Sequence, residues 1–214
     1  MPGGKNCGIP SAMTALKKSD GLISPEEYLE GEKLADVRHE YLAGVVYAMA
    51  GASLRHNEIA QNISAWLRAA LRGKPCRTFI EAVKVRIPRA EDTVFYYPDV
   101  FVAGDPRDTH DYYSDFPSVI FEVLSPDTTR FDWREKRWAY QTIETLQTYV
   151  LVDQFKPEVT VWQRSGEEAP VKLTKPDDIL PLPGLGLSLP LAEIYAGIQF
   201  PTARVAAWYE WQSP

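Results

Sequence analysis

The sequence predicts one globular domain of the α/β or α+β class, with a mixed β-sheet flanked by helices. Short apolar runs with two-residue alternation indicate strands, and they are interspersed with segments whose apolar residues recur at helical spacing. The chain has 214 residues, 45% of them hydrophobic and 24% charged, which suffices for one sizeable core. We expect this domain at residues 23–200, between a disordered N-terminal extension (1–22) and a C-terminal tail (201–214).

Helix signals occur near the start, in the middle and near the end of the domain. The segment 24–27, Ser-Pro-Glu-Glu, has proline in the first turn and a glutamate at the capping-box position, so a helix should begin there. Residues 55–72 form the clearest helix, with a continuous apolar face, and Gly73 should end it. Residues 191–197 should form a short final helix.

Six segments have the composition and alternation of strands. Two of them are joined by the polar, acidic stretch 104–116, which should be a loop. Prolines and glycines punctuate residues 180–190. The predicted strands are residues 45–49, 77–87, 94–102, 117–124, 148–153 and 159–164.

Two of these strands each carry one carboxylate on an otherwise apolar face. Asp99 shares its face with Phe95, Tyr97 and Phe101, and Glu122 shares its face with Ile120 and Leu124. An ionised carboxylate in such a setting costs several kcal/mol unless a cation or hydrogen bonds compensate it. Two of them suggest a divalent metal site. Alternatively, Asp99 could cap a turn created by Pro98, and Glu122 could pair with a structural arginine.

A lysine follows on the next predicted helix. Asp132 should be the N-cap of this helix, with Glu135 completing a capping box, which makes Lys136 a first-turn residue. Lys136 lies on one helix face with Trp133 and Tyr140. Its ammonium could point inward toward the carboxylates, or it could reach solvent while its stem covers Trp133.

These motifs carry a resemblance to a known family. The chain resembles the Uma2 family of restriction endonuclease-like proteins, within the PD-(D/E)XK nuclease superfamily, over roughly residues 23–195. The matching residues are Tyr97-Pro98-Asp99-Val100, Phe121-Glu122-Val123-Leu124-Ser125-Pro126, Asp132, Lys136 and Tyr140, with Arg38-His39-Glu40-Tyr41-Leu42-Ala43-Gly44, Met49-Ala50-Gly51 and His56 upstream.

The resemblance implies a restriction-endonuclease-like core that cleaves DNA with Mg²⁺ or Mn²⁺. Asp99, Glu122 and the backbone carbonyl of Val123 would hold the metal through oxygen ligands. Lys136 would stabilise negative charge in the transition state. Glu40, expected at the end of the first helical segment, would be a third catalytic carboxylate that holds a second metal or positions its water. A homodimer would suit double-strand cleavage.

The chain departs from the superfamily pattern at two positions. Leu124 stands where the superfamily carries its lysine, so the resemblance implies that Lys136 has replaced it from the following helix. In the strand predicted at 77–87, Ala82 stands where many relatives carry an acid. The neighbouring Glu81 would point to the opposite face of a regular strand, which leaves a metal role for this segment in doubt.

Other candidate residues concern the substrate. His56, near the start of the long helix, could contact phosphate or orient water, although a lone histidine there is more often a cap or packing residue. Arg130 and Arg134 could contact DNA as part of a basic cluster with Lys136 and Arg137. A second cluster comprises Arg72, Lys74, Arg77, Lys84, Arg86 and Arg89, and either cluster could equally be a solvated surface.

Composition limits the remaining possibilities. A net charge of −6 and a pI of about 5.2 argue against a protein that coats nucleic acid by charge alone. The sequence has no apolar run long enough for a membrane span and no secretory signal, and Met13 could be the original start. Cys7 and Cys76 form neither a disulfide framework nor a zinc site, so we expect a cytoplasmic protein.

Three alternatives to a nuclease stay open. The first is a nuclease-fold module that binds DNA or a protein partner without cleaving it, which the displaced lysine favours. The second is a transposon-associated or regulatory protein whose strands pair with another chain. The third, a two-carboxylate hydrolase such as a glycosidase, ranks last because no aromatic sugar-binding platform is evident.

Overall fold

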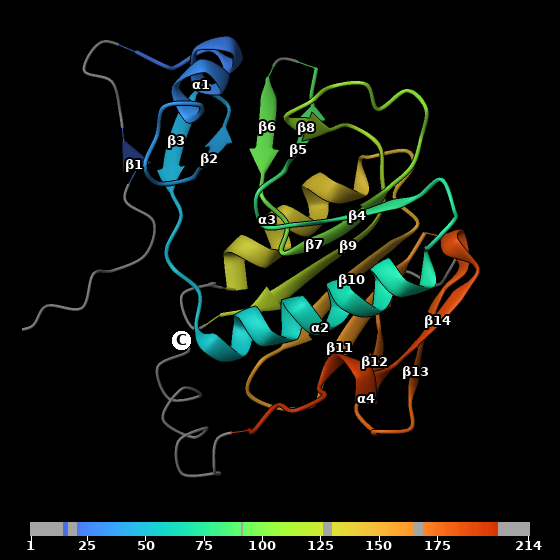
Figure 1. Ribbon diagram of the computed structural model, residues 1–214. Helices are drawn as coiled ribbons and strands as arrows, with labels where there is room; N and C mark the ends of the chain where they lie inside the picture. The colour runs from blue at the N-terminus through green and yellow to red at the C-terminus, as the bar shows by residue number, and fades with distance from the viewer. Residues whose placement is uncertain (1–14, 17–20, 91, 126–129, 165–168, 201–214) are drawn as a thin grey trace, which may run out of the picture.

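The computed structural model describes residues 15–16, 21–90, 92–125, 130–164 and 169–200, with the side chains of 15–16 and 130–133 left out (Figure 1). The expected N-terminal extension and C-terminal tail therefore fall almost entirely outside the described residues. Among the described residues, no helix is both long enough and apolar enough to cross a membrane. The helices are α1 (Pro25–Glu32), α2 (Leu54–Ala70), α3 (Arg130–Gln141), α4 (Leu191–Ile194) and the 3₁₀ turn η1 (Pro183–Leu185).

The strands form two six-stranded mixed sheets and one hairpin, which confirms the α+β class but not the single sheet that we expected. The first sheet has the order β1 (Ala15–Leu16), β3 (Val45–Ala48), β2 (His39–Leu42), β6 (Thr93–Tyr96), β5 (Lys84–Pro88), β8 (Tyr113–Ser114). The second has the order β12 (Val171–Leu173), β11 (Val159–Gln163), β10 (Thr148–Asp153), β9 (Pro117–Leu124), β7 (Val100–Ala103), β4 (Arg77–Ile80). The hairpin pairs β13 (Ile179–Leu182) with β14 (Leu187–Pro190).

The second sheet exists because two of the predicted strands are each broken in the middle. The segment 77–87 divides into β4 and β5, and 94–102 divides into β6 and β7, so that each contributes one strand to each sheet. Pro98 cannot donate a ladder hydrogen bond, and Glu81 adopts a left-handed backbone with φ 37°. The two breaks are joined directly, because the Glu81 N–H donates to the Asp99 carbonyl over 3.2 Å.

The breaks also separate side chains that we expected on one face. Phe95 packs with Tyr28 and Tyr41 beneath α1, whereas Phe101 packs with Ile120 on the side of α3. The predicted common face of Phe95, Tyr97, Asp99 and Phe101 is therefore wrong. The predicted strand 117–124 is confirmed in its bounds as β9, with Ile120 and Glu122 on the α3 side.

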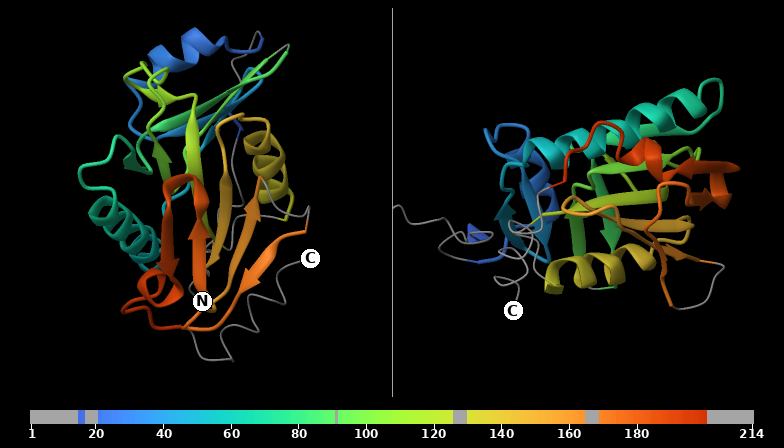
Figure 2. Two further views of the ribbon diagram at one scale, coloured as in Figure 1. Left: turned by 90° about the vertical axis from the view of Figure 1, so that its right-hand side faces the viewer. Right: turned by 90° about the horizontal axis from the view of Figure 1, so that it is seen from below.

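Helices α2 and α3 cover opposite faces of the second sheet, as both views in Figure 2 show. The α2 face is a core of aliphatic residues, with Ile59, Ile63 and Leu67 against Val119 and Phe121. The α3 face is largely aromatic, and here Tyr140 contacts rings from both sheets, lying 5.5 Å from Tyr96 and 5.7 Å from Tyr149 between ring centroids. The α3 side is therefore where the two sheets meet.

Helix starts follow the sequence closely at α1 and less closely at α3. The Ser24 capping box at α1 is confirmed, with both of its hydrogen bonds present. Helix α3 begins at Arg130, ahead of the expected N-cap Asp132, whose side chain lies outside the described residues. An acid is also favourable within the first turn, where it meets the positive end of the helix dipole. As a consequence, Lys136 lies in the second turn of α3.

Candidate metal and nuclease site

The strand register brings Asp99 and Glu122 side by side. Val100 is the partner of Phe121 in the antiparallel pair β7–β9, so Asp99, which directly precedes β7, lies close to Glu122 and Val123 of β9. The charge of Asp99 contributes to the raised pKa of Glu122. The carboxyl end of β9 and the start of α2 lie on the same side of the molecule (Figure 1).

Two fixed groups hold the Asp99 carboxylate, one on each oxygen. The backbone N–H of Val123 donates to Oδ2 over 2.6 Å, and Nε2 of His56 lies 3.0 Å from Oδ1. Ser53 caps α2 by accepting the His56 N–H, which fixes the histidine in the first turn. His56, for which we considered both a structural role and a contact with substrate, contacts Asp99. Burial would lower the pKa of His56, but the hydrogen bond and charge of Asp99 raise it overall.

Glu122 is a buried carboxyl in a setting that resists its ionisation. The Tyr140 hydroxyl donates to its Oε1 over 2.9 Å, and the Lys136 ammonium lies 3.9 Å from the same oxygen. Burial raises the pKa of Glu122 to about 8, with the charges of Asp99 and Glu40 adding to the shift and Lys136 opposing it. A carboxyl of this kind ionises at neutral pH only if another cation approaches it.

Lys136 points inward, and its closest partner is Glu40. The ammonium donates to Glu40 Oε1 over 2.6 Å and lies 5.2 Å from the centre of the Tyr96 ring. Burial would lower the pKa of Lys136, but the charges of Glu122 and Glu40 more than offset it and hold the pKa above its usual range. Charge attraction thus directs the lysine into the site, against the alternative of a solvent-reaching side chain.

Glu40 reaches the site from a strand, whereas we expected it at the end of the first helical segment. Helix α1 ends at Glu32, and Glu40 lies in β2, where the register places it opposite Tyr47 of β3. Its neighbours along β2, His39 and Tyr41, point to the α1 side, so alternation turns Glu40 toward Lys136.

The assembled site carries more negative than positive charge. The side chains of Glu40, Glu122 and Asp99 are only 3%, 12% and 15% exposed, and the cations among them are Lys136 and a His56 of raised pKa. In the part of the chain that the structure describes, no three His, Cys, Asp or Glu side chains already form a metal-binding set. The oxygen donors of the kind that Mg²⁺ or Mn²⁺ prefers are Asp99, Glu122 and the carbonyl of Val123. The N–H and the carbonyl of a strand residue point to the same side, so the Val123 carbonyl should face β7 as its N–H does.

A further acid, Glu81, stands at the edge of this site. Its Oε1 lies 3.3 Å from Nδ2 of Asn57, and its charge contributes to the raised pKa of His56. The expectation that Glu81 would point away assumed a regular strand, and the break with φ 37° removes that assumption. The signal in the sequence was the acid itself, one position from Ala82.

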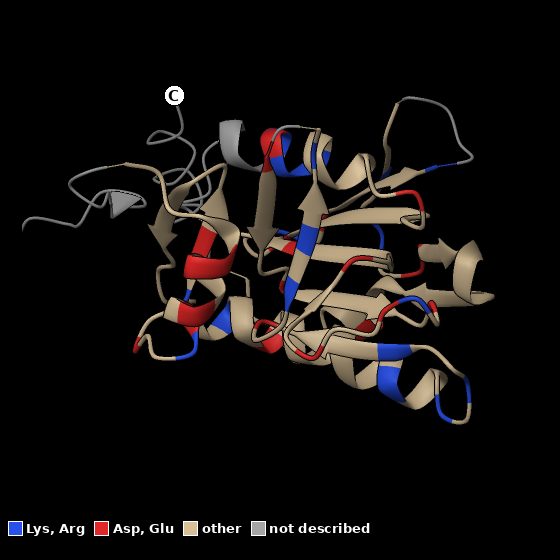
Figure 3. Cartoon of the chain, turned by 90° about the horizontal axis from the view of Figure 1, so that it is seen from above, with Lys and Arg blue, Asp and Glu red and all other residues tan. Residues whose placement is uncertain are grey.

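The predicted basic clusters do not form one surface. Arg134 is exposed on α3, and the Arg130 side chain lies outside the described residues. In the second cluster, Lys84 is buried and Arg86 forms a bidentate pair with Asp115 at 2.7 Å. In the view of Figure 3, basic residues on α2, β5 and α3 lie among acidic ones.

Comparisons with known proteins agree with this architecture. The model of the Uma2 family, described as "Putative restriction endonuclease", matches residues 25–192. Two uncharacterized proteins of Synechocystis sp. are similar: slr1290 is 33% identical over 83% of this chain and 94% of its own length, and sll1609 is 34% identical over 68% and 83%. A crystal structure of a "putative nuclease belonging to DUF820" from Anabaena variabilis shares the fold, with a TM-score of 0.68, 18% identity and coverage of 83% of this chain and 99% of its own.

Proposed function

This chain belongs to the Uma2 family, and we propose that it is a metal-dependent endonuclease that hydrolyses phosphodiester bonds in DNA. The observation that carries the proposal is the excess of buried carboxylate around Lys136. With Glu122 ionised, three acids would face only Lys136 and His56, and a further cation would lower the cost of that ionisation. A divalent ion would both compensate these carboxylates and activate water for phosphodiester hydrolysis.

Asp99, Glu122 and the Val123 carbonyl would hold Mg²⁺ or Mn²⁺, with water as the remaining ligands. When bound, such an ion supplies positive charge to the scissile phosphate and lowers the pKa of a water nucleophile. The Val123 N–H and His56 position the Asp99 oxygens, as groups behind a metal ligand commonly do.

Lys136 would supply the transition-state charge that the superfamily obtains from a lysine on the strand. Its ammonium is buried, and Glu40 fixes it from one side at 2.6 Å while Glu122 lies at 3.9 Å on the other. A charge held in place before the reaction costs little reorganisation, which is the basis of its effect on rate. Glu40 would therefore act first by positioning Lys136 rather than by holding a second metal.

Metal binding can be tested without any substrate. Isothermal titration with Mn²⁺ should show binding to the wild type that Asp99→Asn and Glu122→Gln each abolish, with both variants still folded. Glu193→Gln, which changes an exposed glutamate on α4, is the matched control. Binding of Mn²⁺ at wild-type affinity by either site variant would show that the site is misassigned.

Cleavage is tested separately with supercoiled plasmid and mixed-sequence linear DNA in Mg²⁺ or Mn²⁺. Nicking or linearisation that both site variants lose would support the endonuclease. Double-strand cleavage should be accompanied by a dimer in light scattering, since two-fold symmetry matches antiparallel strands. DNA binding by the wild type with no cleavage of any substrate would favour the non-catalytic module, an alternative consistent with Leu124 at the usual lysine position.

A further inference from the structure

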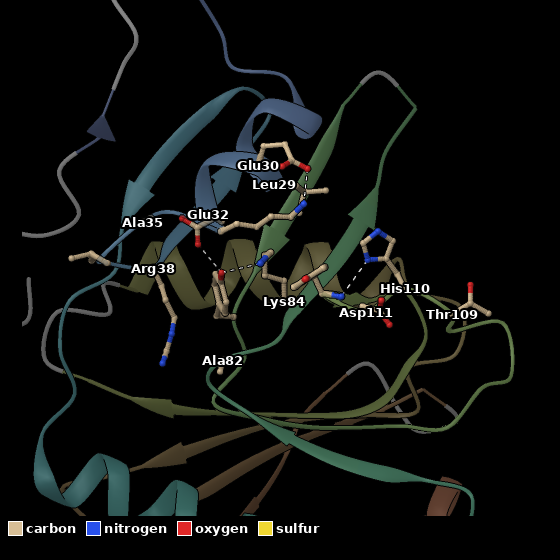
Figure 4. Close-up of a pocket in the computed structure, with 14 residues that line it drawn as sticks. Leu29, Glu30, Glu32, Ala35, Arg38, Ala82, Lys84, Thr109, His110 and Asp111 are labelled. Atoms are coloured by element: carbon tan, nitrogen blue, oxygen red, sulfur yellow. Dashed lines mark hydrogen bonds and ion pairs between the residues drawn. The ribbon is translucent and has the colours of Figure 1, made fainter.

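A pocket of about 590 Å³ lies beside the candidate nuclease site but outside it. Its walls are α1 and the loop that follows, the start of β5, and the loop at residues 109–112 (Figure 4). Pockets of this volume accommodate small organic ligands. None of the proposed metal ligands lines it.

Lys84 is a buried cation in the wall of this pocket. Only 6% of the residue is exposed, and its ammonium donates to the Tyr97 hydroxyl over 3.1 Å. It forms no ion pair with any described carboxylate. The nearby Glu32 is already engaged, since its Oε1 lies 2.7 Å from Nδ1 of His39 and its Oε2 accepts from the Tyr97 hydroxyl over 2.7 Å.

The Lys84 ammonium therefore has hydrogen-bonding capacity to spare. An ammonium has three donors, and Tyr97 accepts from one of them. Burial lowers the pKa of Lys84, and the charge of Glu32 opposes this shift without cancelling it. An anion entering the pocket would provide both the acceptors and the opposite charge.

Arg38 brings a second cation to the same pocket. Its side chain extends from the loop after α1 toward Ala82 (Figure 4), and one guanidinium N–H donates to the Glu81 carbonyl over 3.0 Å. Arg38 lines the pocket together with Tyr97 and Lys84. The remaining N–H groups of a guanidinium form a fork that suits a phosphate.

The pocket and the nuclease site share the two strand breaks. Tyr97, in the pocket, precedes Asp99 by two residues, so their Cα atoms are at most about 7 Å apart. Glu81, whose carbonyl accepts from Arg38, donates its own N–H to the Asp99 carbonyl. The pocket lies on the α1 side of the first sheet, whereas Glu40 and Lys136 meet on its other side, so the two sites are connected through the backbone at the strand breaks.

We infer that this pocket is a phosphate-binding subsite, in which Lys84 and Arg38 hold the phosphate of a nucleotide. The inference rests on the proposed function for the source of that phosphate, which a free nucleotide could also supply. The volume exceeds what a bare ion needs, and the ring of Tyr112, 54% exposed at the rim, offers a surface on which a base can stack.

The experiment measures binding in EDTA, so that it does not depend on metal or cleavage. One arm titrates a fluorescein-labelled 12-nucleotide DNA strand at several salt concentrations, and the other titrates dAMP against deoxyadenosine by calorimetry. The variants are Lys84→Met and Arg38→Gln, with Lys172→Met as the control. Lys172 is an exposed lysine that pairs with Glu158 on the second sheet.

Each pocket variant should weaken strand binding and reduce the slope of log K against log salt by about 0.7, the value for one phosphate contact on a single strand. The control should keep the wild-type slope. The full chain should bind dAMP at least roughly tenfold more tightly than deoxyadenosine, and both pocket variants should lose this preference. Arg38 is exposed, so Arg38→Gln remains informative if Lys84→Met does not fold.

The outcomes separate the subsite from the nuclease. If dAMP binds through Lys84 and Arg38 but the strand does not bind, the subsite stands with a free nucleotide as its ligand, and the proposed DNA substrate loses support. If the strand binds with an unchanged salt slope in both variants, the subsite is wrong and the nuclease proposal is unaffected. Absence of binding by both strand and dAMP overturns the subsite.

Discussion

The raised pKa of Glu122 makes the metal-free protein less stable as pH rises, and Glu122→Gln should remove that loss. The folded-state pKa is about 8 and the ordinary value is 4.5. The difference of about 3.5 units corresponds to roughly 5 kcal/mol in the free energy of unfolding above pH 8, at about 1.4 kcal/mol per unit. This is a large fraction of the stability of a typical domain.

The sign follows from the direction of the shift. A carboxyl whose pKa is raised by folding contributes its full stability below about pH 4.5 and loses it as pH rises through about 8. His56, whose pKa is also raised, changes stability in the same direction, so the pH dependence of the wild type alone is ambiguous. A comparison with Glu122→Gln isolates Glu122, because glutamine stays neutral and its carbonyl can still accept from Tyr140.

Urea unfolding at pH 5 and pH 9 in EDTA provides the measurement. The variant and the wild type should differ little at pH 5, and the variant should be more stable by about 2–5 kcal/mol at pH 9. Glu193→Gln should follow the wild type at both values. If Glu122→Gln loses as much stability between the two pH values as the wild type does, the pKa of Glu122 is not raised by folding, and the argument that Glu122 lacks a compensating cation is refuted.

Three further predictions concern the groups around the metal ligands. Lys136→Ala should keep Mn²⁺ and DNA binding but lower the rate of single-turnover cleavage by ~10²-fold or more. Lys136→Arg should recover little of that rate, because the guanidinium has a different shape. Unchanged cleavage by Lys136→Ala would show that the lysine takes no part in the mechanism. His56→Ala should weaken Mn²⁺ binding by about 10-fold or more, because Asp99 loses the group that positions it. His56→Gln should restore part of the affinity by offering Asp99 an N–H donor. If His56→Ala binds Mn²⁺ as tightly as the wild type in calorimetric titration, the histidine does not position Asp99. Glu81→Gln should lower the pKa of His56, because the substitution removes a negative charge that raises that pKa. NMR titration of the His56 ring measures the change, and an unchanged pKa would mean that Glu81 does not face His56.

The sequence predicted those parts of the fold that depend on local rules. The capping box at Ser24 and the strand Pro117–Leu124 follow from short-range hydrogen bonding and alternation, and the structure has both. The break at Glu81 was missed, and the break at Pro98 was considered only as an alternative, because the alternation of apolar residues continues through both. Only the pairing of each half with different neighbours distinguishes one long strand from two short ones.

The sequence predicted which residues belong to the candidate site more fully than it predicted how they contact one another. Lys136 lies beside Glu40 and Glu122, and Asp99 accepts the N–H of Val123 next to Glu122, so the residues of these motifs come together. The roles of His56 and of the β2 strand under Glu40 depend on contacts between segments distant in the chain. Such contacts leave no periodic signal in a single sequence.

The strand breaks also give the site a mechanical property. Glu40 lies in a strand of the first sheet, whereas Glu122 lies in a strand of the second sheet and Asp99 directly precedes another. The Lys136 ammonium connects the two sheets by pairing with both Glu40 and Glu122. A force that changes the angle between the two sheets, such as a bound, bent nucleic acid would exert, would first change the distances between these charged groups. The spacing of these charges therefore depends on how the two sheets are placed relative to each other.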